Sequence, residues 1–453
     1  MNGGARSVPF REAFAFWLKL GLVNFGGPAG QIALMHQELV ERRRWIDEPR
    51  FLHALNFCML LPGPEAQQLA IYVGWLLHGV RGGLAAGVLF VLPAFFLMLG
   101  LSVLYALHGK LGAVAAVFSG LRGAVLAIVA TALARIGARA LARPGAPFVA
   151  AGAFLAIFAL GVPFPWIIAG AALGGLLFGR LWPKAWGSAV HRSASEAGEG
   201  VTADIALSPA ALAPPRVTRA LRTAAAGLVA WWAPLGLVMA LAGPRHVLSR
   251  EALFFSEAAM VTFGGAYAVL AYIHQAAVQR YGWLTAPEML DGLGLAESTP
   301  GPLIMVTEFV GFLGAFRHPG ELPPLAAGAL GAAVTTWATF APCFLWIFLG
   351  APYVERLRAS RALGAALSAV TAAVVGVILN LAVWFGLHAL FGTVARAEVA
   401  GISLPAVRLS NLDPIVLAIA VAGFLGMWKR GWGMVPVILG SAAVGLLRFA
   451  LLP

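Results

Sequence analysis

Charged residues are scarce in this sequence. They make up only 11% of its 453 residues, while 60% are hydrophobic and the mean hydropathy is +0.85. Soluble domains carry about 25% charged residues. A soluble protein of this composition would have too little polar surface to cover its core. Runs of roughly twenty apolar residues instead indicate an all-α polytopic membrane protein.

Several chemical signatures are missing as well. The two cysteines, Cys58 and Cys343, lie inside apolar segments, so neither a disulfide nor a metal site is expected. The chain has no Walker loop, no metal-spaced His/Cys cluster and no serine with a paired base. We therefore expect no ATP-driven pump, no enzyme and no cofactor. The net charge of +12 falls in short loops, which is typical of membrane topology rather than of nucleic-acid binding.

One stretch of the chain occurs twice. Residues 25–64 and 263–302 agree without a gap at fifteen of forty positions, a constant 238 residues apart. Both copies contain Phe-Gly-Gly near the start and Pro-Gly-Pro at the end. Such self-similarity indicates two structural repeats. We place them at residues 1–181 and 249–453, joined by residues 182–248.

In both repeats the two motifs interrupt apolar segments. The legs on either side barely reach across about 30 Å of hydrocarbon as single helices. We expect broken or re-entrant hairpins at residues 10–40, 51–80, 252–279 and 289–312. Nine crossings remain, or ten or more if the hairpin legs are themselves spans. The nine expected crossings are residues 83–106, 113–134, 147–161, 164–180, 222–242, 326–350, 362–388, 413–428 and 433–452.

The basic residues are distributed oppositely in the two halves. The first half has Arg42–Arg44 where the second has only Arg280. Conversely, Lys429-Arg430 replaces the uncharged turn at residues 162–165. The positive-inside rule therefore predicts two inverted-topology repeats, with residues 182–248 forming a cytoplasmic linker and one connecting transmembrane helix. Inverted repeats with broken helices near the bilayer centre are the construction of secondary transporters.

Each break begins a new helix inside the membrane. The first N–H groups of a helix and the positive end of its dipole favour anions, and glycine allows the backbone to approach a ligand closely. We therefore expect a site for a tetrahedral oxyanion, with simple helix packing as the alternative. The candidate substrate-binding residues are Asn24, Gly26, Gly27, Gly63, Gln67, Gln68, Arg122, Gly264, Gly265, Ser298, Thr299 and Gly301.

Three charged residues within apolar segments are candidates for specific roles, because charge is costly in the membrane. Glu65 stands in the first turn of a helix and would repel a dianion unless protonated, so we interpret it as a proton-coupling acid; helix capping is the alternative. Glu297 is the second such acid. Arg122 would either neutralise a bound dianion or pair with a buried carboxylate.

The motifs also resemble those of a known family. They are Phe25-Gly-Gly-Pro, Trp45, residues 62–67 (PGPEAQ), Thr262-Phe-Gly-Gly, Trp283-Leu-Thr and residues 296–304 (AESTPGPLI). Together they resemble the chromate ion transporter family in its long, two-domain form, over nearly the whole chain except the linker and the ends.

This resemblance implies a multi-pass protein of the bacterial inner membrane that exports chromate, driven by the proton-motive force. Its implied partners are chromate, sulfate as a related dianion, protons and membrane lipid; a homodimer is also compatible. A sulfate or other oxyanion permease remains an alternative, since chromate and sulfate share charge and tetrahedral shape. A passive anion channel is a further alternative, which would need no titrating group.

Overall fold

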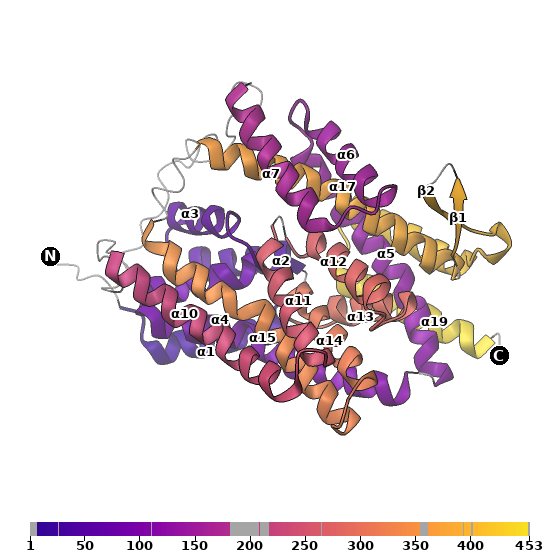
Figure 1. Cartoon of the computed structure of the whole chain (residues 1–453), viewed down its shortest axis with the longest axis horizontal. Helices are drawn as coiled ribbons and strands as arrows, with labels where there is room; N and C mark the ends of the chain where they lie inside the picture. Colours follow the sequence, from indigo (N-terminus) through magenta and orange to yellow (C-terminus); the bar gives the residue numbers. More distant parts are fainter. Residues whose placement is uncertain are drawn as a thin grey trace.

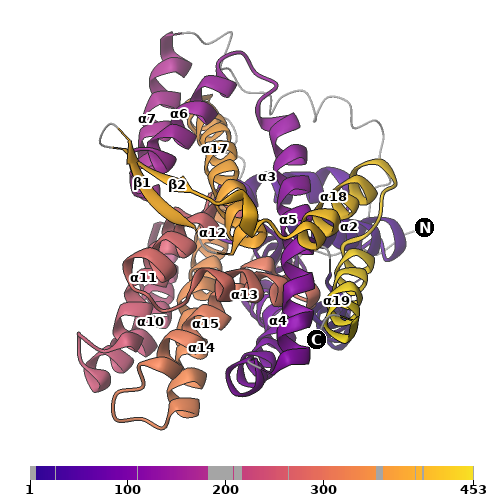
Figure 2. The same cartoon turned by 90° about the vertical axis from the view of Figure 1, so that its right-hand side faces the viewer.

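The computed structural model describes residues 7–25, 27–109, 111–181, 208, 217–263, 265–353, 361–392, 394–399 and 402–451. These residues are almost entirely helical, which confirms the expected all-α class. One feature was not anticipated. A two-stranded antiparallel hairpin, β1 (Ala395–Val399) and β2 (Ile402–Ala406), precedes α18 (Figure 2).

Seven of the described helices are long and apolar enough to cross a membrane. Two shorter apolar helices, α6 (Ala146–Phe158) and α18 (Pro414–Lys429), fall on the remaining two expected crossings. The chain is therefore a polytopic α-helical membrane protein. The seven long helices are α4 (Glu65–His108), α5 (Gly112–Ala140), α7 (Phe164–Leu181), α10 (Val217–Ala242), α15 (Pro324–Gly350), α17 (Arg361–Phe391) and α19 (Met434–Leu451).

Shorter helices end and restart at the repeated motifs. In the first half α1 (Phe10–Val23) is followed by α2 (Gly27–His36), and α3 (Glu48–Cys58) is followed by α4. In the second half α11 (Val247–Val261) precedes α12 (Ala266–His274), and α13 (Ala286–Ser298) precedes a 3₁₀ turn, η4 (Leu303–Met305), and α14 (Val306–Arg317).

Matched details accompany these breaks. Both α2 and α12 finish in a π-helical turn, η1 (Gln37–Arg42) and η3 (Gln275–Arg280). The Pro-Gly-Pro glycines share a left-handed backbone, with φ of 122° at Gly63 and 124° at Gly301. An L side chain rarely adopts such a backbone, so glycine is required for the chain to turn here. The two copies therefore share local conformation as well as sequence.

Helix α4 is a hairpin rather than one straight rod. It bends at His78 and Gly79, whose φ values are −134° and 62°. The legs then fold together so closely that a Cβ on Gly74 would lie 2.5 Å from the Gly82 carbonyl oxygen. In the second half, α14 and α15 pack in the same manner through Gly311 and Gly331. Small residues at these crossings allow the backbones to approach.

The two halves are interleaved (Figure 1). Helix α5 of the first half packs against α18 and α19 of the second, while α17 of the second packs against α6 and α7 of the first. The same small-residue contact occurs at both of these interfaces between the halves. Gly445 packs against the Ala116 carbonyl, and Gly175 packs against the Ala365 carbonyl. Helices α4 and α15 also pack together, so contacts between halves run through the whole molecule.

Candidate anion site at the helix breaks

The four breaks pair crosswise between the halves. The Gly63 N–H donates to the Thr262 carbonyl at 2.8 Å, and the Gly301 N–H donates to the Asn24 carbonyl at 2.9 Å. Asn24 and Thr262 are equivalent positions of the repeat, as are Gly63 and Gly301. Each Pro-Gly-Pro turn is therefore hydrogen-bonded to the residue that precedes Phe-Gly-Gly in the opposite half. The sequence could not indicate this exchange.

The glycines at the breaks have two different surroundings. A Cβ on Gly63 would lie 2.8 Å from the Gln68 amide and 2.9 Å from the Cys343 sulfur, and one on Gly301 would overlap Ala94. At these positions protein atoms occupy the space beside the glycine, and the role of the two glycines in substrate binding stays a prediction. Gly27 is freer, since a Cβ there would meet only Met434, at 3.8 Å. Gly26 and Gly264 lie outside the described residues.

Buried amide side chains with unmet hydrogen-bonding capacity gather at the breaks. Asn24 is fully buried, and neither its Nδ2 nor its Oδ1 has a partner. Gln68 donates to the Pro62 carbonyl at 2.8 Å and Gln67 to the Gly87 carbonyl at 3.4 Å, but the Oε1 atom of each is unpaired. Buried polar groups are normally satisfied, so unmet capacity on this scale indicates a place for a polar ligand or water.

A fourth amide, Gln31, belongs with them and was missed by the sequence analysis. It stands one helical turn after Gly27 and donates to the Gly301 carbonyl at 2.6 Å, while its Oε1 has no partner. Its position on the first turns of α2 links that helix start to the Pro-Gly-Pro turn of the other half. A search for every amide within the broken legs would have found it.

Both candidate acids contact the first turn of α12. A Glu65 carboxylate oxygen lies 3.2 Å from the position of a Cβ on Gly265, so this carboxylate fills the space that the glycine leaves. Glu297 is 6% exposed and accepts a 2.8 Å hydrogen bond from the Tyr267 hydroxyl. Two carboxylates from opposite halves thus contact residues at the start of α12, with Tyr267 as a contact that the sequence did not indicate.

The hydroxyl groups of Ser298 and Thr299 are directed to their own helix. Ser298 donates to the Leu295 carbonyl at 2.9 Å, and Thr299 donates to the Ala296 carbonyl at 3.3 Å. They cap the end of α13, where carbonyl groups have no intrahelical partner. Their donors are therefore engaged in the structure, although the hydroxyl oxygens can still accept a hydrogen bond.

Arg122 is paired with a carboxylate. Its Nε lies 3.0 Å from Asp291 Oδ1 and its Nη2 lies 3.3 Å from Oδ2, while the Tyr105 hydroxyl donates to the same carboxylate at 2.9 Å. This bidentate pair links α5 to α13. The arginine is neutralised by protein, which is the alternative that the sequence left open.

Two more carboxylates are buried in α11 and α14. Glu251 and Glu308 are both 0% exposed, and none of their four oxygens has a hydrogen-bond partner. Glu251 lies against Gly314, where a Cβ would come within 2.7 Å of its Oε1. The apolar context of both residues is visible in the sequence, but their lack of partners is not.

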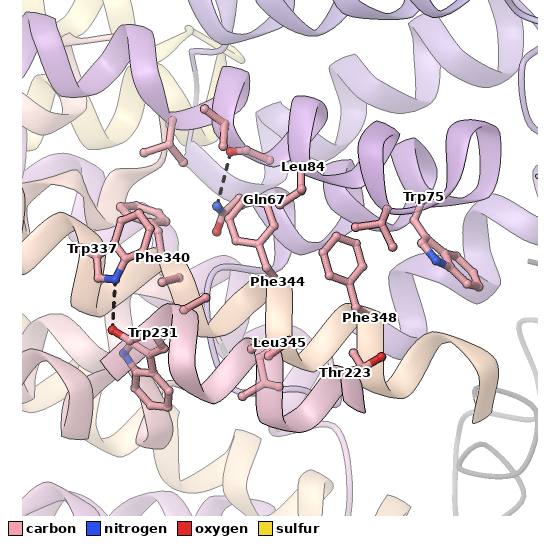
Figure 3. Close-up of a pocket in the computed structure, with 18 of the residues that line it drawn as sticks. Gln67, Trp75, Leu84, Thr223, Trp231, Trp337, Phe340, Phe344, Leu345 and Phe348 are labelled. Atoms are coloured by element: carbon pink, nitrogen blue, oxygen red, sulfur yellow. Dashed lines mark hydrogen bonds between the residues drawn. The ribbon is translucent and has the colours of Figure 1, made fainter. Parts of the chain in front are cut away.

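A groove adjoins the amide cluster. It has a volume of about 950 Å³ and runs between α4, α10 and α15 (Figure 3). Gln67 lies in its wall beside Gly87 and Phe344, and the other walls are mainly aliphatic and aromatic. The groove therefore reaches the polar cluster from the side of the helix bundle.

The fold and the site define the class of protein: a multi-pass membrane protein with polar groups buried at broken helices. A sequence profile described as chromate transporter matches residues 11–176 and 250–446, which cover most of the chain. The chain belongs to the chromate transporter family. It is accordingly a transporter and not an enzyme.

Curated relatives match over nearly their full length. The chain is 33% identical to the chromate transport protein of Pseudomonas aeruginosa over 450 residues, 98% of this chain and 93% of that protein. It is 28% identical to a probable chromate transport protein of Synechococcus elongatus, over 93% of this chain and 96% of the relative. For the chromate transport protein of Cupriavidus metallidurans the identity is 27%, over 99% and 95%. No solved structure matches.

Proposed function

We propose that this protein is a secondary transporter that exports chromate across the bacterial inner membrane, coupled to the proton-motive force. The observation that carries the proposal is the group of buried amides with unmet hydrogen-bonding capacity at the helix breaks: Asn24, Gln31, Gln67 and Gln68. Among their unpaired atoms Asn24 Nδ2 is the donor, and it and the N–H groups at the helix starts suit the acceptor oxygens of a tetrahedral dianion, whereas the unpaired amide oxygens suit water or a protonated carboxyl group. Family membership and the names of the relatives support chromate as that dianion.

We further propose that the two halves have inverted topology, with the breaks near mid-membrane. The reciprocal hydrogen bonds of Gly63 and Gly301 support a two-fold relation between the halves. Between the equivalent loops after Arg42 and Arg280 lie α3, α4, α5, α6, α7, α10, α11 and α12. If α3 with the first leg of α4, and α11 with α12, form re-entrant hairpins, the second leg of α4 and the helices α5, α6, α7 and α10 give five crossings. An odd number places the two loops on opposite sides of the membrane.

The direction of transport follows from charge. The membrane potential is negative inside and acts on each moving charge with about 2.3 kcal/mol per 100 mV. A dianion is therefore driven outward. Proton coupling is assigned to Glu65 and Glu297, since a carboxylate beside a dianion is repelled unless it is protonated. Both lie at the first turn of α12, so protonation and anion binding would act on the same helix start.

The proposal is tested with purified protein in proteoliposomes that are loaded with chromate or sulfate. We expect chromate flux that responds to an imposed pH gradient, and loss of that pH response in Glu65→Gln and Glu297→Gln. Glu257→Gln is the matched control, because that glutamate is exposed and bonded to Tyr272.

The alternatives give different results in the same assay. Chromate flux that is unchanged in both variants, does not respond to the pH gradient and gives no accumulation against a gradient would assign the protein as a passive anion channel. Preferential flux of sulfate would assign it as a sulfate permease.

A further inference from the structure

The groove between α4, α10 and α15 is too apolar for the transported anion. Its walls include Trp75, Phe340, Phe344 and Phe348, and Gln67 contributes one amide (Figure 3). A dianion entering it would lose hydration without finding matching donors, which is costly. The volume of about 950 Å³ is at the upper end of ordinary ligand pockets. Its chemistry suits hydrocarbon.

One end of the groove is basic. Arg219 and Arg222 lie in the first two turns of α10 and belong to the lining. Both are exposed, and neither has an ion-pair partner among the described residues. Thr223, a hydroxyl donor, follows them. Two free guanidinium groups and a hydroxyl at the mouth of an apolar groove are complementary to a phosphate that carries an acyl chain.

The groove has an ordered sequence of surfaces. Figure 3 places Thr223, Trp75 and Phe348 toward one end and Trp231 and Trp337 toward the other. The Trp337 Nε1–H donates to the Trp231 carbonyl at 3.1 Å and joins α15 to α10 at that far end. The polar head of a single ligand would therefore lie at the basic end of the groove, and its apolar tail would follow α10 along the aromatic wall.

Helix α10 lies at the edge of the bundle, where it packs against α15 and α11. Only 11% of its most apolar 18-residue stretch is buried within the protein, compared with 56% of the corresponding stretch of α15. A molecule in the groove would contact α10 and α4 together and bury apolar surface on both. The position of this connecting helix would then depend on what fills the groove.

We propose that the groove binds an anionic phospholipid, with the phosphate on Arg219 and Arg222 and an acyl chain along the aromatic wall toward Trp337. The lipid site lies beside the candidate anion site, and Gln67 belongs to both. A lipid of the bilayer would then bind the connecting helix α10 as a specific ligand, in addition to the lipids that only surround it.

Native mass spectrometry of the full-length protein tests this. The protein is extracted from bilayers of equal phosphatidylglycerol and phosphatidylcholine, and retained lipid is counted. We expect selective retention of phosphatidylglycerol and a loss of about 30-fold in that selectivity for the double variant R219Q/R222Q, since each arginine near a phosphate contributes about fivefold. Arg245→Gln, beyond the other end of the same helix, should change nothing.

A second pair of variants tests the apolar part. Ala226→Trp fills the groove, whereas Ala225→Trp adds the same ring at an exposed neighbour that does not line it. Only Ala226→Trp should abolish lipid retention. If Ala226→Trp fails to fold, the lipid selectivity of R219Q/R222Q still tests the proposal, because both arginines are exposed.

Equal retention of both lipids by the unmodified protein would overturn the proposal, as would equal effects of R219Q/R222Q and Arg245→Gln. A photo-crosslinker at position 226 that captures residues 182–216 instead of lipid would assign the groove to the linker of the chain.

Discussion

At the scale of single residues, Gly301 shows how closely the halves are fitted. Its φ of 124° belongs to the glycine region, and a Cβ there would overlap Ala94 of the other half. Gly161 has a φ of 62°, and a Cβ at that position would have no neighbour within 4 Å. A side chain at Gly161 would therefore introduce backbone strain alone, whereas one at Gly301 would introduce both strain and crowding.

We expect Gly301→Ala to lower the free energy of unfolding by about 2–4 kcal/mol, the sum of left-handed strain and overpacking. Gly161→Ala should cost only about 1–2 kcal/mol. The measurement is thermal unfolding in detergent. Adding Ala94→Gly should restore part of the loss in Gly301→Ala. Equal losses for both glycine variants would show that crowding at this seam is unimportant.

The pair between Arg122 and Asp291 supports a second prediction. Asp291 is 4% exposed, so removing Arg122 alone leaves a buried carboxylate uncompensated. We expect Arg122→Met or Asp291→Leu to destabilise the protein by about 3 kcal/mol, and the double variant to recover most of this loss. The double variant should also keep chromate transport. Loss of transport in a well-folded double variant would instead make Arg122 a substrate ligand.

At the scale of elements, the start of α13 is held by a network outside the membrane-spanning helices. Thr285 and Glu288 form a capping box, and Arg317 at the end of α14 donates to Glu288 Oε2 at 2.8 Å. Partial burial acts to raise the pKa of Glu288, but the hydrogen bonds from Arg317 and Thr285 prevail and lower it to about 2. The carboxylate therefore stabilises the helix start in its ionised form.

A lowered pKa fixes the direction of the pH dependence. The stabilisation is fully present above the ordinary glutamate pKa of 4.5 and is lost as pH falls toward about 2. Glu288→Gln should cost about 1–2 kcal/mol at pH 7, after allowance for solvent screening, and progressively less below pH 4.5. Thermal unfolding across pH checks this. A cost that is constant from pH 7 to pH 3 would contradict the ionised cap.

The elements themselves could largely be predicted from the sequence. Apolar runs mark helices because a membrane leaves no other way to satisfy the backbone, and the duplicated glycine and proline motifs mark where helices stop. Partners across the breaks could not be predicted. Nothing in the composition around Gly63 or Arg122 indicates that one meets Thr262 and the other Asp291, because the packing of one half on the other fixes those contacts.

At the scale of the whole molecule, equivalent contacts recur on both sides. Gly175 and Gly445 each meet a carbonyl of the opposite half, at Ala365 and Ala116. Reciprocal contacts of this kind are those of an isologous interface, in which the same surface serves both partners. The chain therefore has the internal organisation of a dimer fused into one polypeptide.

The proposed inverted arrangement predicts a labelling pattern. In a background with Cys58 and Cys343 replaced by alanine, single cysteines at Arg44 and Gly282 should react with a membrane-impermeant maleimide from opposite sides of the membrane. Right-side-out and inside-out vesicles distinguish the two faces. Labelling of both positions from one side would show that the repeats are parallel.

The interleaving also restricts how the protein can move. Helix α5 packs against α18 and α19, and α17 packs against α6 and α7. The halves therefore cannot separate as two rigid bodies without breaking both sets of helix contacts. Any opening toward one face and then the other has to arise within the bundle, and α2 and α12 are short and end in irregular turns. We therefore expect the packed helices α5 and α17 to stay in place while the short helices α2 and α12 move.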